Sequence, residues 1–381
     1  MAKRMRVGIV FGGKSGEHEV SIQSAKSVMA SLDPNKYETV PIFISKSGRW
    51  FGSQEATAIL QGQDGQVARF LTTGHEGAGD GVRTELPVES ETAVEVASGE
   101  TVPSMLAQQI DVVLPILHGS NGEDGTIQGL LEVLDLPYVG AGVLASAVGM
   151  DKIFMKTVFA AAGLPQVEYI FFTRKQWQQD KEQILEQIEK TVNYPCFVKP
   201  ANLGSSVGIS KVKSRDQLSE AVDFAARYDR KVIVEEGREV REIEVAVLGN
   251  EQPEASVPGE VIPSAEFYDY AAKYLAGDSE LQIPARVTPE QMQEIRQLAV
   301  RAFQAVDCSG LARVDFFIDK RTNQVLLNEI NTMPGFTQFS MYPKLWEATG
   351  LPYALLIDKL IQLAIERHEE KSQNVTDFSA S

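Results

Sequence analysis

The stretch Gly310 to Ser340, G-L-A-R-V-D-F-F-I-D-K-R-T-N-Q-V-L-L-N-E-I-N-T-M-P-G-F-T-Q-F-S, has the pattern of two strands joined by a turn and followed by a Pro-Gly turn. Successive side chains of a strand point to opposite faces, so Arg313 and Asp315 share one face of the first strand. In the second strand the shared face is expected to carry Leu327, Glu329 and Asn331. Polar side chains therefore interrupt two otherwise apolar strands.

The register of this hairpin decides whether the polar side chains meet. An odd-length loop around Lys320 to Gln324 would place Asp315 opposite Glu329. It would also place Arg313 opposite Asn331. An even loop without a bulge would send one pair to the wrong face, because a one-residue slip inverts every side chain. We expect the odd loop and both pairs.

This arrangement predicts a metal site. Two carboxylates held face to face repel each other unless a cation lies between them, and the oxygens of Asp315, Glu329 and Asn331 form the all-oxygen set that Mg²⁺ takes. Magnesium fills the rest of its shell with water and substrate phosphates. The alternative is a solvated sheet face with an ordinary surface ion pair. The flanking Val, Phe, Ile and Leu residues and the N-T-M-P-G turn favour a site for Mg²⁺ that carries a polyphosphate.

Composition excludes several classes of partner. The chain has 381 residues, 43% of them hydrophobic, which suits two or three globular domains. A net charge of -16 argues against a nucleic acid or an anionic membrane as partner. Cys196 and Cys308 are too few for a disulfide framework or a zinc site. The apolar run near the amino terminus is too short for a signal peptide, so we expect a cytoplasmic protein that spans no membrane.

The first part of the chain reads as a doubly wound α/β domain. The strand Arg6 to Phe11 ends in Gly12-Gly13 and is followed by a helix from near Glu17 to Leu32. His118 follows a later strand at its carboxyl end, where open α/β sheets bind ligands, although a lone histidine is as readily structural. The other expected elements are strands 39–44, 112–116 and 138–140, helix 125–134, and an insertion at 53–104 with one or two strands.

The rest of the chain alternates helices and strands. We expect a helix from Val148 to Gly163 with Lys152 at its start, where an anion partner would offset the helix dipole. The loop after Lys199 holds Ser205 and Ser206, small residues that suit either phosphate binding or a flexible turn. The remaining expectations are strands 167–172, 195–199, 232–235 and 242–247, helices 175–192, 215–228, 288–305, 344–348 and 353–367, and a binding loop near 258–275. We expect the last two helices to pack on the outside.

Several segments together resemble the ATP-grasp enzymes and, within them, the D-alanine:D-alanine ligase family. The resemblance is carried by G-G-K-S-G-E-H-E-V-S, L-H-G-S-N-G-E-D-G, M-D-K, V-K-P-A-N-L-G-S-S-V-G, R-E-I-E-V-A-V-L, F-Y-D-Y-A-A-K-Y, G-L-A-R-V-D-F and N-E-I-N-T-M-P-G-F-T-Q-F-S. It implies an α/β and α+β protein. A Rossmann-like domain at 1–142 would precede two ATP-grasp lobes at 143–238 and 239–381, with a lid at 263–287.

The resemblance also implies roles for individual residues. The ATP contacts would be Lys152, Lys199, Ser205, Ser206, Glu235, Glu242, Lys273 and Asn328. The metal ligands would be Asp315, Glu329 and Asn331, with Glu329 bridging two Mg²⁺ ions for which Mn²⁺ can substitute. The substrate and catalytic residues would be Glu17, His118, Ser205, Lys273, Tyr274, Arg313, Gly335 and Ser340. Among these, Glu17 would anchor the ammonium group of the first substrate, and Ser205 would link Glu17 to Tyr274.

The implied reaction joins two D-alanines at the expense of ATP, through an acylphosphate, for peptidoglycan synthesis in a homodimeric enzyme. A ligase that makes a D-alanine:D-lactate or other mixed product is the alternative within this class. Tyr274 favours the dipeptide, because relatives that use D-lactate carry a histidine at the matching position. A nucleotide-binding module without activity is the non-enzyme alternative, and it predicts gaps at the metal or phosphate positions that the sequence does not have.

Overall fold

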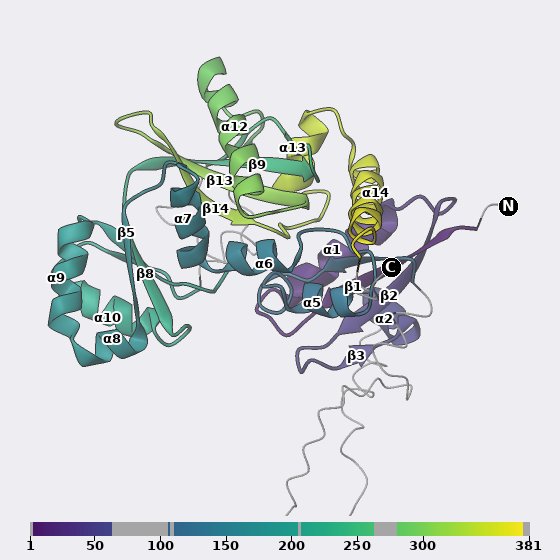
Figure 1. The fold of residues 1–381 in the computed structure, drawn as a ribbon, viewed down its shortest axis with the longest axis horizontal. Helices are drawn as coiled ribbons and strands as arrows, with labels where there is room; N and C mark the ends of the chain where they lie inside the picture. The colour runs from purple at the N-terminus through teal and green to yellow at the C-terminus, as the bar shows by residue number, and fades with distance from the viewer. Residues whose placement is uncertain (1–2, 63–105, 107–109, 205–206, 263–279, 376–381) are drawn as a thin grey trace, which may run out of the picture.

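The computed structural model describes residues 3–62, 106, 110–204, 207–262 and 280–375, which form three units around three sheets (Figure 1). The amino-terminal unit lies at the right of Figure 1, the central lobe at the left and the carboxyl-terminal lobe at the top. The mixed α/β architecture expected from the sequence is confirmed.

The amino-terminal sheet has the order β3-β2-β1-β4, in which β1 pairs in parallel with both β2 and β4. Its strands are β1 (Met5–Gly12), β2 (Tyr37–Ile44), the antiparallel edge strand β3 (Trp50–Phe51) and β4 (Val112–Ile116). Its helices are α1 (His18–Ser31), α2 (Ser53–Leu60) and α5 (Thr126–Val133). Apolar side chains fill both faces of the sheet, as expected for a parallel sheet covered by helices.

The insertion begins with helix α2, because Ala56 and Ile59 recur at a helical spacing and are buried. The one or two strands expected in the insertion stay a prediction, because 63–105 lies outside the described residues. One other local expectation in this unit is wrong. Tyr138 makes one isolated parallel bridge to Val113 instead of a strand.

A pair of helices connects the first unit to the others. The single helix expected from Val148 is two helices, α6 (Val143–Met150) and α7 (Lys152–Ala161), separated at Asp151. Asp151 has an extended backbone, and its carboxylate accepts hydrogen bonds from the N–H groups of Ile153 at 3.0 Å and Phe154 at 3.2 Å. A side-chain cap of this kind begins a new helix, so Lys152 does lie at a helix start.

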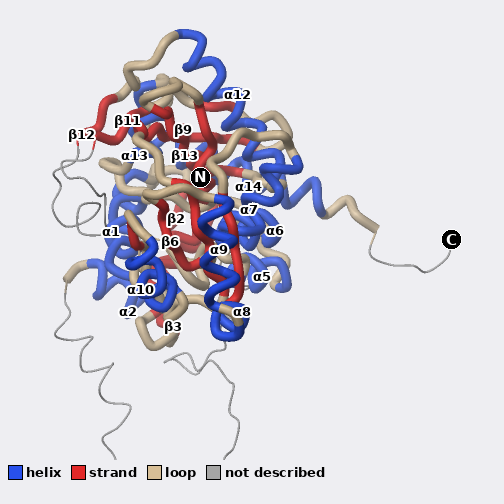
Figure 2. The backbone as a smooth tube through the Cα atoms, turned by 90° about the vertical axis from the view of Figure 1, so that its left-hand side faces the viewer, coloured by secondary structure: helices blue, strands red, loops and turns tan. Residues whose placement is uncertain are grey.

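The central lobe is an antiparallel sheet of order β5-β8-β6-β7 with helices on one face. Its elements are β5 (Tyr169–Thr173), α8 (Arg174–Gln179), α9 (Lys181–Thr191), β6 (Cys196–Pro200), β7 (Ser210–Val212), α10 (Arg215–Ala225) and β8 (Lys231–Glu236). Figure 2 turns this lobe toward the viewer, with α9 in front of the strands. The helix expected at 175–192 is divided at Asp180, which caps α9 through Gln183 N.

The carboxyl-terminal lobe contains an antiparallel sheet of order β12-β11-β9-β13-β14, with β10 beside β9. Its strands are β9 (Val240–Gly249), β10 (Glu254–Ala255), β11 (Gly259–Ile262), β12 (Glu280–Gln282), β13 (Gly310–Asp319) and β14 (Val325–Asn331). Its helices are α12 (Pro289–Ala305), α13 (Met341–Ala348) and α14 (Tyr353–Lys371). Thr288 and Gln291 form the predicted capping box of α12. One face of the sheet packs on α12 and α7.

The hairpin makes both predicted pairs, but not through an odd loop. Arg313 faces Asn331 and Asp315 faces Glu329, whereas Ile318 next to the turn pairs with Val325 and leaves an even number of residues between them. A register shift after Asp315 leaves one extra residue, Asn328, in β14. This bulge turns Leu327 to the opposite face, where it is fully buried in the core, so the predicted shared face of Leu327 with Glu329 is wrong.

Helices α13 and α14 were expected to pack on the outside, and this expectation is wrong. They share one core with the amino-terminal sheet, which includes Val7 and Phe11 of β1 together with Tyr342 and Leu360 of the two helices. In Figure 1, α14 lies between these two units. Among the described residues no single helix is long and apolar enough to cross a bilayer; α13 and α14 reach that length only as a pair bent by 103°.

Candidate active site

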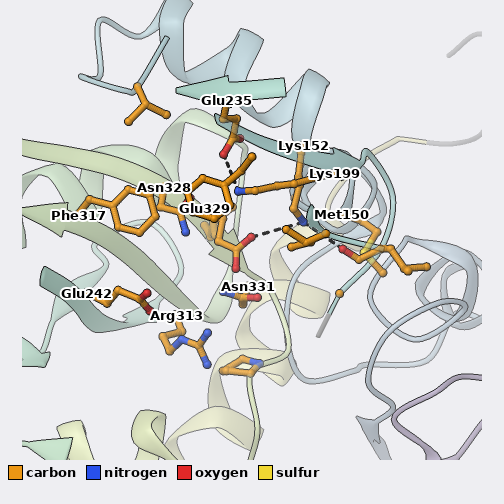
Figure 3. Close-up of a pocket in the computed structure, with 18 of the residues that line it drawn as sticks. Met150, Lys152, Lys199, Glu235, Glu242, Arg313, Phe317, Asn328, Glu329 and Asn331 are labelled. Carbon is orange, nitrogen blue, oxygen red and sulfur yellow. Dashed lines mark hydrogen bonds and ion pairs between the residues drawn. The ribbon is translucent and has the colours of Figure 1, made fainter. Parts of the chain in front are cut away.

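A cavity of about 540 Å³ lies where the three units meet. Figure 3 shows the side chains that line it from the central lobe, from the β13–β14 hairpin and from the start of α7. The predicted residues that line it are Glu17, His118, Lys152, Lys199, Glu235, Glu242, Arg313, Asn328, Glu329, Asn331 and Gly335. The structure therefore brings together residues that are up to about 300 positions apart in the sequence.

One wall of the cavity is a polar half of the carboxyl-terminal sheet. On this face Leu248 and Leu311 lie in the core beneath α13 and α14, whereas farther along the same strands Glu242, Arg313 and Phe317 line the cavity. Side chains two residues apart share a face, so the same alternation that buries the apolar half presents the polar half. The bulge at Asn328 brings both Asn328 and Glu329 to the cavity.

The predicted metal ligands lie together on this wall. Asp315 and Glu329 are cross-strand neighbours, and Asn331 donates a hydrogen bond from Nδ2 to Asp315 Oδ2 at 3.0 Å. Two carboxylates and a side-chain amide oxygen, available after a flip of the Asn331 amide, are donors of the kind that Mg²⁺ prefers. Among the described residues, no group of three or more His, Cys, Asp and Glu side chains could hold a metal ion without the asparagine. The donor set fits a hard divalent cation.

Arg313 holds the carboxylate of Asp315 in this arrangement. Its Nε and Nη2 donate to the two oxygens of Asp315 at 2.7 Å each, and Glu244 Oε2 lies 3.0 Å from Nε. Burial would lower the pKa of Arg313, but the charges of Asp315 and Glu244 outweigh it and raise the pKa well above the ordinary value. Arg313 is thus a fixed cation in a wall of carboxylates.

The facing wall carries lysines. Lys152 Nζ donates to the carbonyl oxygen of Leu203 at 3.1 Å and lies 3.5 Å from Glu329 Oε2 (Figure 3). Lys199 Nζ lies 2.5 Å from Glu235 Oε2. Alternation in β6 and β8 directs Lys199 and Glu235 to the cavity while Val198 and Val234 enter the core of the central lobe.

Glu235 joins two lysines behind this wall. Its other oxygen lies 3.3 Å from Nζ of Lys156, a side chain that is fully buried. Burial alone would raise the pKa of Glu235, but the charges of Lys156 and Lys199 outweigh it and lower the pKa to about 2. The pKa of Lys156 is lowered, chiefly because burial disfavours its charged form. The carboxylate therefore stays ionised and fixes Lys199 at the cavity wall.

The inner end of the cavity is formed by the amino-terminal unit. Glu17 directly precedes α1, and its carboxylate lies between Gly119 and Gly204, where added Cβ atoms would meet its oxygens at 3.3 and 3.6 Å. His118 is buried, and burial lowers its pKa to about 4. Because a carbonyl oxygen only accepts, His118 Nδ1 donates to Met333 O at 3.1 Å, and Nε2 then accepts from Ser24 Oγ at 3.2 Å.

Several predicted residues lie elsewhere. Ser340 begins α13, and its Oγ accepts from Thr337 N at 3.1 Å; a Cβ added to Gly335 would meet this Oγ at 3.2 Å. Ser340 does not line the cavity, and Asp315 lies beside Glu329 and Asn331 in the hairpin wall without itself lining the cavity. Ser205, Ser206, Lys273, Tyr274 and most of the predicted lid, 263–279, lie outside the described residues.

Sequence reasoning missed three residues of the site. Lys156 follows Lys152 by four positions and so lies on the same side of α7. Glu244 follows Glu242 by two positions in β9 and shares its face. Glu123 lies in the quoted segment L-H-G-S-N-G-E-D-G and lines the cavity near Glu17; burial, with the charge of Glu17, raises its pKa well above the ordinary value. The spacing could have indicated the first two residues.

Comparison with protein families identifies two matching family models. Residues 6–141 match the model described as D-ala D-ala ligase N-terminus, and residues 158–362 match D-ala D-ala ligase C-terminus. The chain is 50% identical to a D-alanine–D-alanine ligase of Geobacillus thermodenitrificans over 375 residues, which cover 98% of this chain and 99% of the relative. A D-alanine–D-alanine ligase of Bacillus licheniformis is 50% identical over 371 residues, 97% of this chain and 98% of the relative.

Solved structures of similar proteins cover almost the whole chain. The D-alanine-D-alanine ligase from Coxiella burnetii is 38% identical with a TM-score of 0.80, covering 98% of this chain and 97% of that one. The VanG D-Ala:D-Ser ligase from Enterococcus faecalis is 32% identical with a TM-score of 0.77, covering 95% of this chain and 100% of that one. The expected fold, an amino-terminal Rossmann-like domain and an ATP-grasp fold, is confirmed by these neighbours.

Proposed function

Because the chain belongs to the D-alanine–D-alanine ligase family, we propose that it uses ATP to join two D-alanine molecules into D-alanyl-D-alanine, a building block of peptidoglycan. The observation that carries this proposal is the charge arrangement of the cavity. Lysines on one wall face a row of carboxylates on the other across a space of about 540 Å³. Such a space suits a nucleoside triphosphate whose phosphates contact lysines directly and carboxylates through a divalent cation.

We propose that Lys152 and Lys199 bind the phosphates of ATP, with Ser205 and Ser206 covering them. Lysine ammonium groups neutralise the charge that the transferring phosphoryl group carries. Glu235 and Glu242 contact the adenine and ribose. Asn328, which the bulge brings to the cavity, also contacts ATP. The ion pair of Lys199 with Glu235 supports this assignment, since it fixes the ammonium group at the cavity wall.

Asp315, Glu329 and Asn331 would hold Mg²⁺, or Mn²⁺ in its place, and two ions would share Glu329. When bound, the cation neutralises the terminal phosphates and orients them for in-line transfer. The fit of the donors to a hard cation supports this proposal.

The substrate residues follow from the inner end of the cavity. Glu17 would bind the ammonium group of the first D-alanine beside His118, with Ser205 and Tyr274 completing the link. Attack of its carboxylate on the γ-phosphorus forms D-alanyl phosphate and releases ADP. The amine of the second D-alanine then attacks the acyl carbon, loses a proton and expels phosphate.

During both steps Arg313 and the Gly335 N–H would stabilise the oxyanion, and Lys273 and Ser340 would bind the second carboxylate. The closed lid would exclude water, which otherwise hydrolyses the acylphosphate.

The test is phosphate release from ATP with D-alanine, L-alanine, D-serine or D-lactate supplied in turn, and mass spectrometry of the products. We expect release that depends on D-alanine and yields D-alanyl-D-alanine. Release independent of every substrate would contradict the ligase assignment. A mixed product with D-serine or D-lactate would support the alternative within the family, for which the similarity to a D-Ala:D-Ser ligase is the relevant observation.

We also propose that the protein is a cytoplasmic homodimer, as implied by the resemblance to the family. Light scattering of the purified chain tests the oligomeric state. A monomer at the concentrations used in the assays would contradict the dimer without affecting the proposed reaction.

A further inference from the structure

Three carboxylates lie side by side across neighbouring strands of the cavity wall. Asp315 in β13 pairs with Glu244 of β9 on one side and with Glu329 of β14 on the other. Neighbouring strands are about 4.8 Å apart, so the row is narrow enough for one cation to contact two members. Arg313 lies in this row, bound to both oxygens of Asp315 and 3.0 Å from Glu244 Oε2 through Nε.

The carboxylate of Asp315 has two partners, the divalent cation and the Arg313 guanidinium. As a metal ligand it must give an oxygen lone pair to the divalent cation, and the cation repels a guanidinium beside it. Here both oxygens of Asp315 accept hydrogen bonds from Arg313. Metal binding therefore competes with the Arg313 contact.

Arg313 cannot resolve this competition by losing its charge. A guanidinium remains protonated in proteins, and the side chain of Arg313 is only 17% exposed. A buried charge that loses its partner is destabilising, and this cost would weaken metal binding. Arg313 requires a second anion within reach of a small rotation. Glu244 lies on the side of Asp315 away from Glu329 and already approaches Nε at 3.0 Å.

We propose that Glu244 is a positioning residue that receives the Arg313 guanidinium when a divalent cation takes Asp315. This inference rests on the proposed function, since it takes Asp315 as a metal ligand. Transfer of the guanidinium from Asp315 to Glu244 frees one carboxylate for the metal and keeps Arg313 in the cavity wall. Glu244 thereby sets the metal affinity without touching the metal.

The first measurement is Mn²⁺ binding in the presence of ADP, by electron paramagnetic resonance of the free ion, for the wild type and Glu244→Gln. Glutamine keeps the volume but removes the charge, so Arg313 stays on Asp315. We expect Mn²⁺ to bind about 10- to 100-fold more weakly, the range typical of residues that act on a metal through its ligands. An unchanged affinity would overturn the proposal.

A double-mutant cycle with Arg313→Met separates this role from a direct one. Without the guanidinium, Arg313 no longer competes with the metal for Asp315, and only the neutral Asn331 amide still donates to this carboxylate. Glu244→Gln should therefore have no further effect on Mn²⁺ affinity in the Arg313→Met background. The same loss in both backgrounds would show that Glu244 acts on the metal directly, as a ligand or by its charge, and would overturn the proposal.

Glu260→Gln provides the matched control. Glu260 lies in β11 of the same sheet and binds Arg241 at 2.7 and 2.6 Å, but neither residue lines the cavity. We expect its Mn²⁺ affinity to equal that of the wild type, and a comparable loss would overturn the proposal as a nonspecific effect of removing a glutamate.

Phosphate release and Mn²⁺ binding by the wild type distinguish failure of this inference from failure of the proposed function on which it rests. Wild-type protein that shows D-alanine-dependent phosphate release but no effect of Glu244→Gln refutes only the role of Glu244. Wild-type protein that binds no Mn²⁺ refutes the metal site and this inference together.

Discussion

The two walls of the cavity differ in charge and in what supports them. The lysine wall presents Lys199 on the central-lobe sheet, which has its own core, and Glu235 ties Lys199 to the buried Lys156 of α7. The hairpin wall presents carboxylates around Arg313, on a lobe whose core continues through α13 and α14 into the amino-terminal unit. One wall can bind phosphates directly and the other only through a cation.

The difference indicates how the parts can move. The amino-terminal unit and the carboxyl-terminal lobe share buried side chains, so they behave as one body, whereas the central lobe has a separate core. The central lobe joins that body through α7, where Lys152 N donates to Ala201 O at 3.0 Å, and through chain segments around Pro165 and Arg238. A movement of the central lobe would therefore carry Lys199 and Glu235 away from the carboxylate wall, whereas Lys152 and Lys156 lie on α7, which packs on β14 of the carboxyl-terminal lobe.

The largest expected effect comes from removing one charge of the hairpin wall. Glu329→Gln keeps the side-chain volume but removes the oxygen charge that the metal requires, so we expect turnover to fall by about 100-fold or more with the fold intact. Steady-state phosphate release and circular dichroism are the measurements. Glu254→Gln, an exposed glutamate of β10, is the control. Wild-type turnover in Glu329→Gln at ordinary Mg²⁺ would refute the role of this wall.

Substitutions in the lysine wall should change the stability of the central lobe. Glu235→Gln takes from the fully buried Lys156 and the partly buried Lys199 the carboxylate that they share, so we expect the free energy of unfolding of the central lobe to fall by about 3–5 kcal/mol. Lys156→Met leaves Glu235 paired with Lys199 and fills the space, and its cost should be about 1 kcal/mol or less. Urea unfolding monitored by exchange of α9 amides measures both. Equal losses would refute the view that one carboxylate serves two lysines.

The pH dependence should distinguish the two bodies. The pKa of His118 is lowered to about 4, so the unfolded chain binds a proton near pH 6.5 that the folded chain does not, and stability falls as the pH drops from 6.5 to 4. We expect the titration of His118 to lower the free energy of unfolding by about 3 kcal/mol over this pH range. The pKa of Glu235 is lowered to about 2, so its contribution persists to below pH 4.5 and is lost toward pH 2.

Hydrogen exchange of α1 and α14 compared with α9, between pH 7 and 4, measures this difference. His118→Gln should remove the loss between pH 6.5 and 4 in the shared body. If stability fell equally with pH in the variant and in the wild type, His118 would be excluded as the source of the pH dependence.

The smallest effect is expected at the junction of the lobes. Arg238 binds Glu236 of the central lobe at 2.8 Å and Asp319 of β13 at 3.3 Å, and its side chain is 23% exposed. Partly exposed ion pairs contribute about 0–1 kcal/mol, so Arg238→Met should change the unfolding free energy by less than about 1 kcal/mol. Thermal unfolding tests this. A larger loss would mean that the junction, and not the separate cores, holds the lobes together.

Alternation and spacing were sufficient to predict much of the hairpin. The pairs Asp315 with Glu329 and Arg313 with Asn331 follow from residues that share a strand face. The bulge at Asn328 does not follow, because its energy depends on the neighbouring strand and on packing of Leu327 in the core. The breaks at Asp151 and Asp180 were missed for a related reason: an aspartate inside a periodic stretch is also compatible with a continuous helix.

The sequence by itself determined most strands, several helix starts, many of the lysines and carboxylates of the site, and the family to which they belong, because these depend on residue type and local spacing. Only the tertiary structure decided which groups share a partner: Lys156 with Lys199 on Glu235, Glu244 with Asp315 on Arg313, and α14 with the amino-terminal sheet. The physical reason is that burial and ion pairing depend on distances between segments far apart in the chain, and side-chain periodicity carries no information about those distances.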